Sequence, residues 1–296
     1  MDIKLKTLLM VNETKNYTIA ARKLNLTQPA VSQHIKALEK EFGITIFVRQ
    51  GNDLVLTNDG NTLVKYARKI DSLYENLLIK LEDSKKKTKT LRIGITHTGE
   101  STAIMDVLAV YSTTHKGTLI TITSDTIKNL YDKLSSFELD LVFVEGNKND
   151  KKYASISLDS ETIMVAMSAH HPLAKQNSIT IKQLQKENLI LRTIGSTTRK
   201  LFTHELEKID YSLDDFTISM EIDNIATIKD LVKKNIGVSI LPKSVCYEEV
   251  ENHSIKLLPI ENISLVREVN LLYQKDFLEQ EVIDDILNLY KETVTI

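Results

Sequence analysis

The chain has 296 residues, of which 42% are hydrophobic and 26% charged, so it has the composition of an ordinary globular protein with more than one domain. A single cysteine, Cys246, excludes an intramolecular disulfide and fits a reducing cytosol. No apolar run approaches the roughly 20 residues that span a bilayer, and residues 1–4 lack the apolar core of a signal peptide. We therefore expect a cytoplasmic protein without a membrane partner.

The net charge of −2 hides an uneven distribution along the chain. Residues 1–90 carry 16 Lys and Arg against 10 Asp and Glu, whereas the remainder carries 22 against 30. A basic N-terminal part is suited to polyanions, and an acidic remainder is repelled by them. Chance segregation of surface charge would give the same counts, so the asymmetry favours nucleic-acid binding without deciding it.

Residues 16–42 have the pattern of two short helices joined by a tight turn. Asn16 is a good cap for the first helix. Asn25 follows that helix and tolerates the left-handed conformation of a turn. Thr27 is a good cap for the second helix, predicted from residue 28 to about 41. The sequence therefore predicts a helix-turn-helix.

The second of these helices has one apolar face and one polar face. Helical spacing places four apolar residues on the buried face: Val31, Ile35, Leu38 and Phe42. The polar face can then enter a major groove, where Gln reads adenine and Lys reaches guanine or phosphate. We predict DNA contacts from Thr27, Gln28, Pro29, Ser32, Gln33, His34 and Lys36.

A small β-hairpin is predicted directly after the helix pair. Residues 44–48 and 54–56 are rich in strand-forming side chains, and residues 50–53 between them favour a turn. The hairpin would form a wing beside the second helix. Arg49 stands at the base of this wing, where it is placed to contact a phosphate.

Together these segments resemble the LysR-type transcriptional regulators over about sixty residues. The matching positions are Leu5, Leu8, Ala20, Ala21, Leu24, all six residues from Thr27 to Ser32, Ile35, Leu38, Glu39, Phe42, Gly43, Ile46, Phe47, Arg49, Leu56, Thr57 and Gly60. Leu8 stands where the family usually has an aromatic residue, and Asn16 replaces the usual Ser cap. The resemblance implies a winged helix-turn-helix domain over residues 1–58 that binds double-stranded promoter DNA and works with RNA polymerase. A helix-turn-helix used only for protein contacts is the alternative.

One long helix is predicted from residue 57 to 87. It carries two sets of residues at seven-residue spacing: Leu63, Ile70 and Leu77, and Ala67, Tyr74 and Leu81. Together they form a seam typical of a coiled-coil dimer, although the same seam could pack on the protein's own body. The resemblance favours a linker and dimerisation helix at residues 59–89, and a homodimer or homotetramer that reads a dyad-symmetric site.

From residue 91 onward, short apolar strands alternate with helical patterns, which is typical of an α/β fold. The family resemblance extends loosely over this part, through residues 171–174, 195–199 and 237–242. It implies an effector-binding domain at residues 90–296, built of two lobes like a periplasmic binding protein. Lobe I would comprise about residues 90–160 and 266–296, and lobe II about residues 161–265.

Two strand-to-helix turns, at residues 96–100 and 195–199, are rich in hydroxyl groups and suit an anion at a helix N-terminus. Residues 96–98 also resemble the corresponding turn of the family's cysteine-biosynthesis regulators, whose cleft accepts sulfate-like anions or acetylated serine. We expect a small-molecule effector, an anion, in contact with Thr96, His97, Thr98, Ser101, Thr197 and Thr198. Each threonine could instead only cap a helix, and Arg199 could either offset the anion or pair with a carboxylate.

No pattern in the sequence indicates an enzyme, a metal or a cofactor. The seven histidines are scattered, a single cysteine cannot form a CxxC site, and no phosphate loop or GxSxG elbow is present. Two other classes of protein remain. A solute-binding protein would need an export signal and has no use for residues 1–56, and an architectural DNA binder would show no ligand-induced rise in thermal stability.

Overall fold

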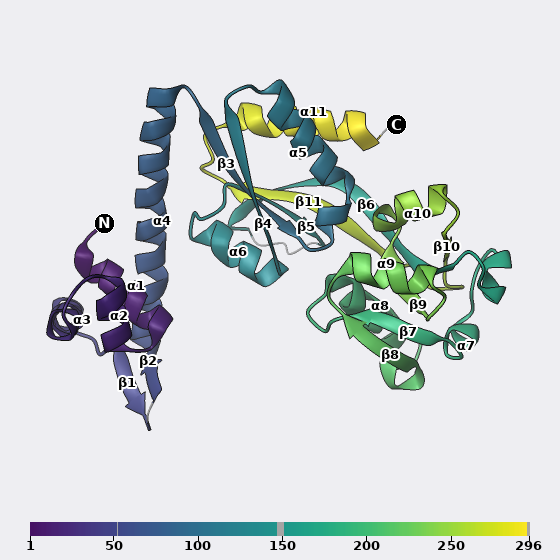
Figure 1. Cartoon of the computed structure of the whole chain (residues 1–296), viewed down its shortest axis with the longest axis horizontal. Coiled ribbons are helices and arrows are strands. Elements are labelled where there is room, and N and C mark those ends of the chain that lie inside the picture. Colours follow the sequence, from purple (N-terminus) through teal and green to yellow (C-terminus); the bar gives the residue numbers. More distant parts are fainter. Residues whose placement is uncertain (52, 147–150, 295–296) are drawn as a thin grey trace. The chain divides into compact units, whose positions relative to one another are not determined.

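A computed structural model describes the chain except for residues 52, 147–150 and 295–296, and except for the side chains of Ser101 and Val294 (Figure 1). The chain forms two compact units. The N-terminal unit comprises Met1–Thr90 with Asp132–Glu138, and the C-terminal unit comprises Leu91–Tyr131 with Leu139–Ile296. None of the described helices is long and apolar enough to cross a membrane.

Three helices form the core of the N-terminal unit: α1 (Ile3–Thr14), α2 (Tyr17–Lys23) and α3 (Gln28–Phe42). The predicted caps are present, since the Asn16 side chain accepts hydrogen bonds from the backbone N–H groups of Thr18 and Ile19, and Thr27 accepts one from Ala30. Such caps stabilise a helix by about 1 kcal/mol each. Local sequence signals therefore set where α2 and α3 begin.

The apolar face of α3 is buried as predicted except at its end. Val31, Ile35 and Leu38 lie in the core with residues of α1 and α2. Phe42 is 49% exposed, so its predicted burial is wrong. Phe42 is the last residue of α3, and Gly43 follows with a left-handed φ of 65° that turns the chain away. The apolar residues of α3 therefore continue at helical spacing for one turn beyond the part of the helix that packs on the core.

The wing consists of β1 (Phe47–Gln50) and β2 (Asp53–Leu56), which pair antiparallel from Phe47↔Leu56 to Gln50↔Asp53. The predicted first strand started three residues too early. Ile44 and Ile46 belong to the hydrophobic core of the unit and lie outside the ladder of the hairpin. Residue 52, inside the predicted turn, lies outside the described residues.

Helix α4 (Asn58–Lys86) begins at Thr57, whose hydroxyl accepts a hydrogen bond from the Gly60 N–H at 2.9 Å. Its first turns pack on the helix-turn-helix, because Val64 and Ala67 are buried in the same core as α1 and α3. Farther along, the seven-spaced apolar side chains are exposed in the single chain, namely Ile70, Tyr74, Leu77 and Leu81. The predicted seam is thus divided: its start belongs to the unit's own core, and the rest faces outward.

The C-terminal unit is built on two sheets that share one strand, β6. The strand order is β4-β3-β5-β11-β6-β9-β7-β8, with β10 paired to β6. The strands of lobe I are β3 (Lys89–Thr96), β4 (Thr118–Asp125), β5 (Leu141–Glu145), β11 (Val266–Gln274) and the first half of β6 (Tyr153–Ser168). Those of lobe II are β7 (Asn188–Arg192), β8 (Thr217–Ile222), β9 (Val238–Pro242), β10 (Ile255–Leu258) and the second half of β6.

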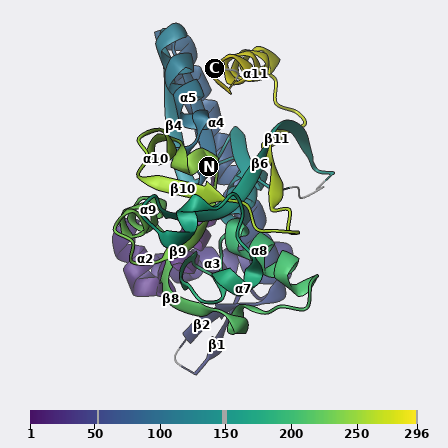
Figure 2. The ribbon, with the colours of Figure 1, turned by 90° about the vertical axis from the view of Figure 1, so that its right-hand side faces the viewer.

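Strand β6 links the two lobes. It pairs with β11 from Tyr153 to Thr162 and with β9 from Ile163 to Ala166, so it leaves one sheet and enters the other at this point. Figure 2 shows β6 and β11 running side by side. The sequence predicted only residues 162–166 as a strand here. In the earlier half of β6, half-buried residues alternate with exposed polar residues, so this half lacks the continuous apolar run of the later half.

Helices cover both sheets (Figures 1 and 2). Lobe I carries η1 (Gly99–Ser101), α5 (Ala103–Thr114), α6 (Ile127–Ser135, whose last residues group with the N-terminal unit) and α11 (Gln280–Val294). Lobe II carries η2 (Pro172–Lys175), α7 (Ile181–Leu184), α8 (Thr197–Glu207), η3 (Leu213–Asp215), α9 (Ile225–Lys233), η4 (Ser244–Cys246) and α10 (Tyr247–Glu251). One core fills lobe I and two fill lobe II. The predicted mixed α/β fold with a winged helix-turn-helix is confirmed.

Candidate DNA-binding face and ligand pocket

The predicted DNA-binding residues lie on one side of α3 and on the wing. Exposed side chains are those of Thr27, Gln28, Pro29, Gln33, Lys36 and, on β1, Arg49. Ser32 is half-buried. Because Val31, Ile35 and Leu38 are directed into the core, the opposite side of α3 presents flexible hydrogen-bonding groups. This arrangement is the one that a recognition helix needs to reach base edges and phosphates.

His34 differs from its neighbours on α3. Its Nδ1 lies 2.9 Å from Thr7 Oγ1, and that hydroxyl donates its own hydrogen to the Ile3 carbonyl. The Nδ1–H therefore donates to Thr7, which fixes the half-buried ring against α1. Only the Nε2 edge of His34 is left to contact DNA.

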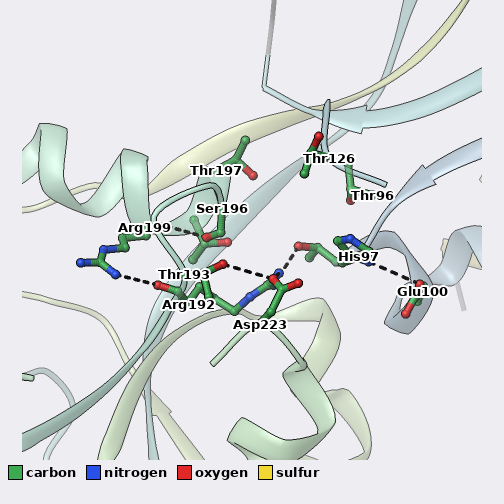
Figure 3. A network of polar contacts seen from close by, with 12 residues as sticks. Thr96, His97, Glu100, Thr126, Arg192, Thr193, Ser196, Thr197, Arg199 and Asp223 are labelled. Carbon is green, nitrogen blue, oxygen red and sulfur yellow. Dashed lines mark hydrogen bonds and ion pairs between the residues drawn. The ribbon is translucent and has the colours of Figure 1, made fainter. Parts of the chain in front are cut away.

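In the C-terminal unit, a cavity of about 100 Å³ lies between the lobes at the carboxyl ends of their strands. Lobe I contributes Thr96, His97, Thr98, Asp125, Thr126 and Ile127, and lobe II contributes Arg192, Thr193, Gly195, Ser196, Thr197 and Asp223 (Figure 3). Ligands of open α/β sheets commonly bind at such an edge. Four of the six predicted effector residues line this cavity: Thr96, His97, Thr98 and Thr197.

Thr96 is hydrogen-bonded to a buried carboxylate. Its hydroxyl lies 2.7 and 2.8 Å from the two oxygens of Glu145, which ends the neighbouring strand β5, and it also accepts a hydrogen bond from the Gly99 N–H. Burial raises the pKa of Glu145, although nearby Arg267 and the Thr96 hydrogen bond oppose the rise. Thr96 therefore connects the lining of the cavity to a carboxyl group behind it.

Thr197 and Thr198 begin helix α8 and both contact Arg267. The Arg267 Nη1 donates to Thr197 Oγ1 at 2.8 Å and to Thr198 Oγ1 at 3.3 Å. Thr198 is 1% exposed and is not among the residues that line the cavity. In this conformation Thr198 holds α8 against β11, so its side chain is out of reach of a ligand, contrary to the sequence-based expectation. The side chain of Ser101 lies outside the described part of the chain.

Arg199 and His97 both lie near carboxylates. Arg199 Nη1 lies 2.8 Å from Glu221 Oε1 on β8 and also donates to the Arg192 carbonyl. His97 Nδ1 lies 3.7 Å from Glu100 Oε1. Arg199 thus takes the second of its two expected roles, pairing with a carboxylate, although the carboxylate comes from a neighbouring strand.

Arg192 is the residue that sequence reasoning missed. It ends the apolar strand β7 and is 4% exposed, yet it lines the cavity. Its Nη2 donates to Asp223 Oδ1 at 3.1 Å, and its Nη1 lies 3.5 Å from Thr98 Oγ1 (Figure 3). The hydrogen bond from Arg192 lowers the pKa of Asp223. The sequence did contain a signal for this position, because Arg192 is a charged residue at the carboxyl end of an otherwise apolar strand.

Two family models match the chain and together cover most of it. The model described as "Bacterial regulatory helix-turn-helix protein, lysR family" matches residues 4–61, and the "LysR substrate binding domain" matches residues 84–295. Among curated proteins, the HTH-type transcriptional regulator CysL of Bacillus subtilis is 28% identical over 271 residues, which cover 91% of this chain and 89% of CysL.

Solved structures share the fold. Full-length CbnR complexed with its target DNA is 15% identical, with a TM-score of 0.71 and coverage of 99% of this chain and 100% of that one. The Synechocystis CcmR regulatory domain in complex with 2-PG is 18% identical, with a TM-score of 0.61 and coverage of 69% of this chain and 98% of that domain. The family models, over both the helix-turn-helix and the two-lobed unit, place this chain in the family of LysR-type transcriptional regulators.

Proposed function

We propose that the chain acts as a homodimer, or a dimer of dimers, that reads a dyad-symmetric promoter site and responds to a small molecule bound between the lobes of the C-terminal unit. It would work with RNA polymerase in the cytoplasm. The effector would carry an anionic group. No enzymatic step and no cofactor belong to this proposal.

The observation that carries the DNA-binding part is the division of α3 into two faces. Val31, Ile35 and Leu38 fill the core, and Gln33 and Lys36 stand exposed on the same helix. Arg49 extends the polar surface onto the wing. Side chains on α3 would read bases, and Arg49 would position the protein on the backbone.

The dimer part is supported by the outer two-thirds of α4. Ile70, Tyr74, Leu77 and Leu81 repeat with heptad spacing and are exposed in the single chain. An apolar stripe of this length on a helix is stable in water when a second helix covers it. A two-fold pair of chains would present two recognition helices, which matches a dyad-symmetric operator.

The effector part is supported by the cavity between the lobes. Hydroxyl groups of Thr98, Thr193 and Ser196, together with Arg192, line a site at the start of α8. Oxyanions bind well at helix N-termini. A ligand held there would shift the balance between quaternary arrangements only through a difference in its affinity for them. The CcmR regulatory domain in complex with 2-PG is a ligand complex of a similarly folded domain.

The DNA-binding part is tested by selecting operators from a random DNA pool with the wild-type chain. Affinity for the selected site is then measured for Gln33→Ala and Lys36→Ala, with Lys182→Ala on α7 as the control. We expect each α3 variant to bind at least about tenfold more weakly, since a base contact contributes roughly 1–3 kcal/mol. Lys36→Ala should also reduce the salt dependence of binding if it contacts a phosphate.

The far-UV circular dichroism of both variants should equal that of the wild type, because neither side chain enters the core. Unchanged affinity in both variants would remove α3 from the recognition role. Loss of helical signal together with affinity would indicate misfolding, and the control Lys182→Ala shows how much a distant lysine contributes.

A further inference from the structure

The guanidinium of Arg192 is buried with part of its hydrogen-bonding capacity unused. The residue is 4% exposed, and its Nη2 and Nη1 face Asp223 and Thr98. Its Nε has no hydrogen-bond partner among the described residues. A buried charged donor without an acceptor is costly. Because Arg192 lines the cavity, a ligand with an acceptor there would remove that cost.

The other charges around the cavity are mostly negative. Asp223 after β8 and Asp125 at the end of β4 both line it, against one arginine, and Asp125 Oδ1 also accepts hydrogen bonds from the Thr126 N–H and the Asn129 Nδ2. Arg192 lowers the pKa of Asp223, so this carboxylate is ionised at neutral pH. His97 is the remaining titratable side chain in the lining. A simple dianion such as sulfate would therefore lie beside two carboxylates, those of Asp125 and Asp223, and one guanidinium. The negative charges of the dianion and of the two carboxylates would repel one another.

A ligand that carries both charges fits this lining better than an anion alone. We propose that the cavity binds a small zwitterion of the amino-acid class, whose carboxylate accepts from Arg192 and whose ammonium group is held by Asp223 and Asp125. The hydroxyls of Thr98, Thr193 and Ser196 supply neutral hydrogen bonds around it. The cavity of about 100 Å³ has room for the two charged groups of such a small ligand. This inference rests on the proposed effector function and narrows its ligand.

The ordinary expectation for this edge of the fold is an anion at the start of α8. Arg192 and Asp223 change that expectation, because they form a charge pair whose two members both border the cavity. A zwitterion can bridge such a pair by giving an acceptor to one side and a donor to the other. The net charge of the cavity then changes little on binding, which avoids burying an uncompensated charge.

The test uses the full chain and its thermal unfolding midpoint, Tm. The probes are the twenty proteinogenic L-amino acids, β-alanine and taurine, each compared with its N-acetyl derivative and, for the carboxylic acids, its methyl ester. Sodium sulfate is the inorganic anion. We expect at least one free amino acid to raise Tm by about 3 °C or more at saturating concentration, and its N-acetyl and ester derivatives to raise it by less than a third of that.

Two variants assign the contacts to residues. Arg192→Lys keeps the charge but loses the fork of donors, and should weaken binding of the active amino acid at least about tenfold. Asp223→Asn removes the negative charge that would hold the ammonium group, at a side chain that is 57% exposed, and should weaken the same ligand by a similar factor. Asp214→Asn on η3 is the matched control and should leave binding unchanged.

The zwitterion proposal is overturned if sulfate raises Tm while no amino acid does, or if the N-acetyl derivative acts as strongly as the free amino acid. It is also overturned if no probe shifts Tm. Binding of the selected operator by the wild-type chain is measured in parallel. Retained operator binding in any of these cases separates failure of this inference from failure of the proposed DNA-binding function.

Discussion

Arg267 and Glu161 face each other across the two strands that join the lobes. They are directly opposite partners in the β11–β6 ladder, and the Arg267 Nη2 and Nε donate to Glu161 Oε2 at 2.6 and 2.9 Å. Both side chains are buried, and Ser244 also donates to Glu161. Arg267 reaches Thr197 and Thr198 as well, so one guanidinium connects the crossing strands to the start of α8.

Removing one member of this pair should strongly destabilise the C-terminal unit. Arg267→Met leaves the Glu161 carboxylate buried without its cation, which costs about 3–5 kcal/mol. Urea unfolding followed by far-UV circular dichroism measures the loss, since the chain has no tryptophan to report it. The double variant Glu161→Gln with Arg267→Met should be more stable than the single Arg267→Met variant, because the unpaired charge is gone.

The matched control for that experiment is Lys23→Met, which breaks the exposed pair between Lys23 and Glu13. This variant should lose less than about 1 kcal/mol. If Arg267→Met and Lys23→Met destabilise the chain equally, the buried pair does not hold the crossing strands.

Glu145 should give the chain a pH-dependent stability above its ordinary pKa of 4.5. Burial raises its pKa in the folded chain, with Arg267 and Thr96 opposing and Glu161 adding to the rise. The folded state therefore binds the proton more tightly than the unfolded state. The stabilisation is complete below pH 4.5 and is lost as the pH rises through the raised pKa.

Glu145→Gln removes this ionisation and keeps an acceptor for the Thr96 hydroxyl. Its Tm should exceed that of the wild type at pH 8 and approach it as the pH falls toward 5, with about 1.4 kcal/mol for each unit of pKa shift. Glu251→Gln, on the exposed end of α10, should show no such trend. A Tm difference that is the same at every pH would refute the buried ionisation.

Leu77→Glu should prevent formation of the proposed dimer. Leu77 is 53% exposed in the single chain and lies in the middle of the outward seam of α4. A charge there would have to be buried in the coiled coil, and the resulting penalty of several kcal/mol should weaken association at least about 100-fold. Sedimentation velocity measures the change. Thr62→Glu, on the same helix but off the seam, is the control, and an unchanged mass for Leu77→Glu would exclude α4 as the interface.

Gly60→Ala should destabilise the N-terminal unit and reduce DNA binding. A Cβ at Gly60 would overlap the Ile46 carbonyl oxygen, which belongs to the backbone and has no flexible end that can move aside. Overpacking of this kind costs roughly 1–3 kcal/mol. Gly195→Ala is the control for stability, because no atom lies within 4 Å of its Cβ position. A Tm equal to that of Gly195→Ala would show that α4 can shift away from β1 at no cost.

The helix-turn-helix could be derived from the sequence because its determinants are local. Asn16 and Thr27 cap helices through backbone groups two or three residues away, and the burial of Val31, Ile35 and Leu38 follows from their spacing on one helix. Such interactions depend on residues within one or two helical turns. The exception is Phe42, whose burial depended on how far the rest of the core extends along α3.

The lining of the cavity was only partly predictable. Thr96, Thr98 and Thr197 line it as the hydroxyl-rich strand-to-helix turns indicated, and His97 lies in the first of these turns. Arg192 was missed and Thr198 misplaced because their partners are distant in the chain: Asp223 is 31 residues from Arg192, and Arg267 is 69 residues from Thr198.

The sequence by itself thus determined the family, the helix-turn-helix and many of the strands and helices of the C-terminal unit, since periodicity and capping act over short distances. Only the tertiary structure decided which polar groups share the cavity and which lie behind it. The reason is that a side chain's partner, and with it the side chain's charge balance, is fixed by how strands far apart in sequence pair in the folded unit. Glu161 and Arg267, 106 residues apart, meet only because β6 and β11 lie side by side.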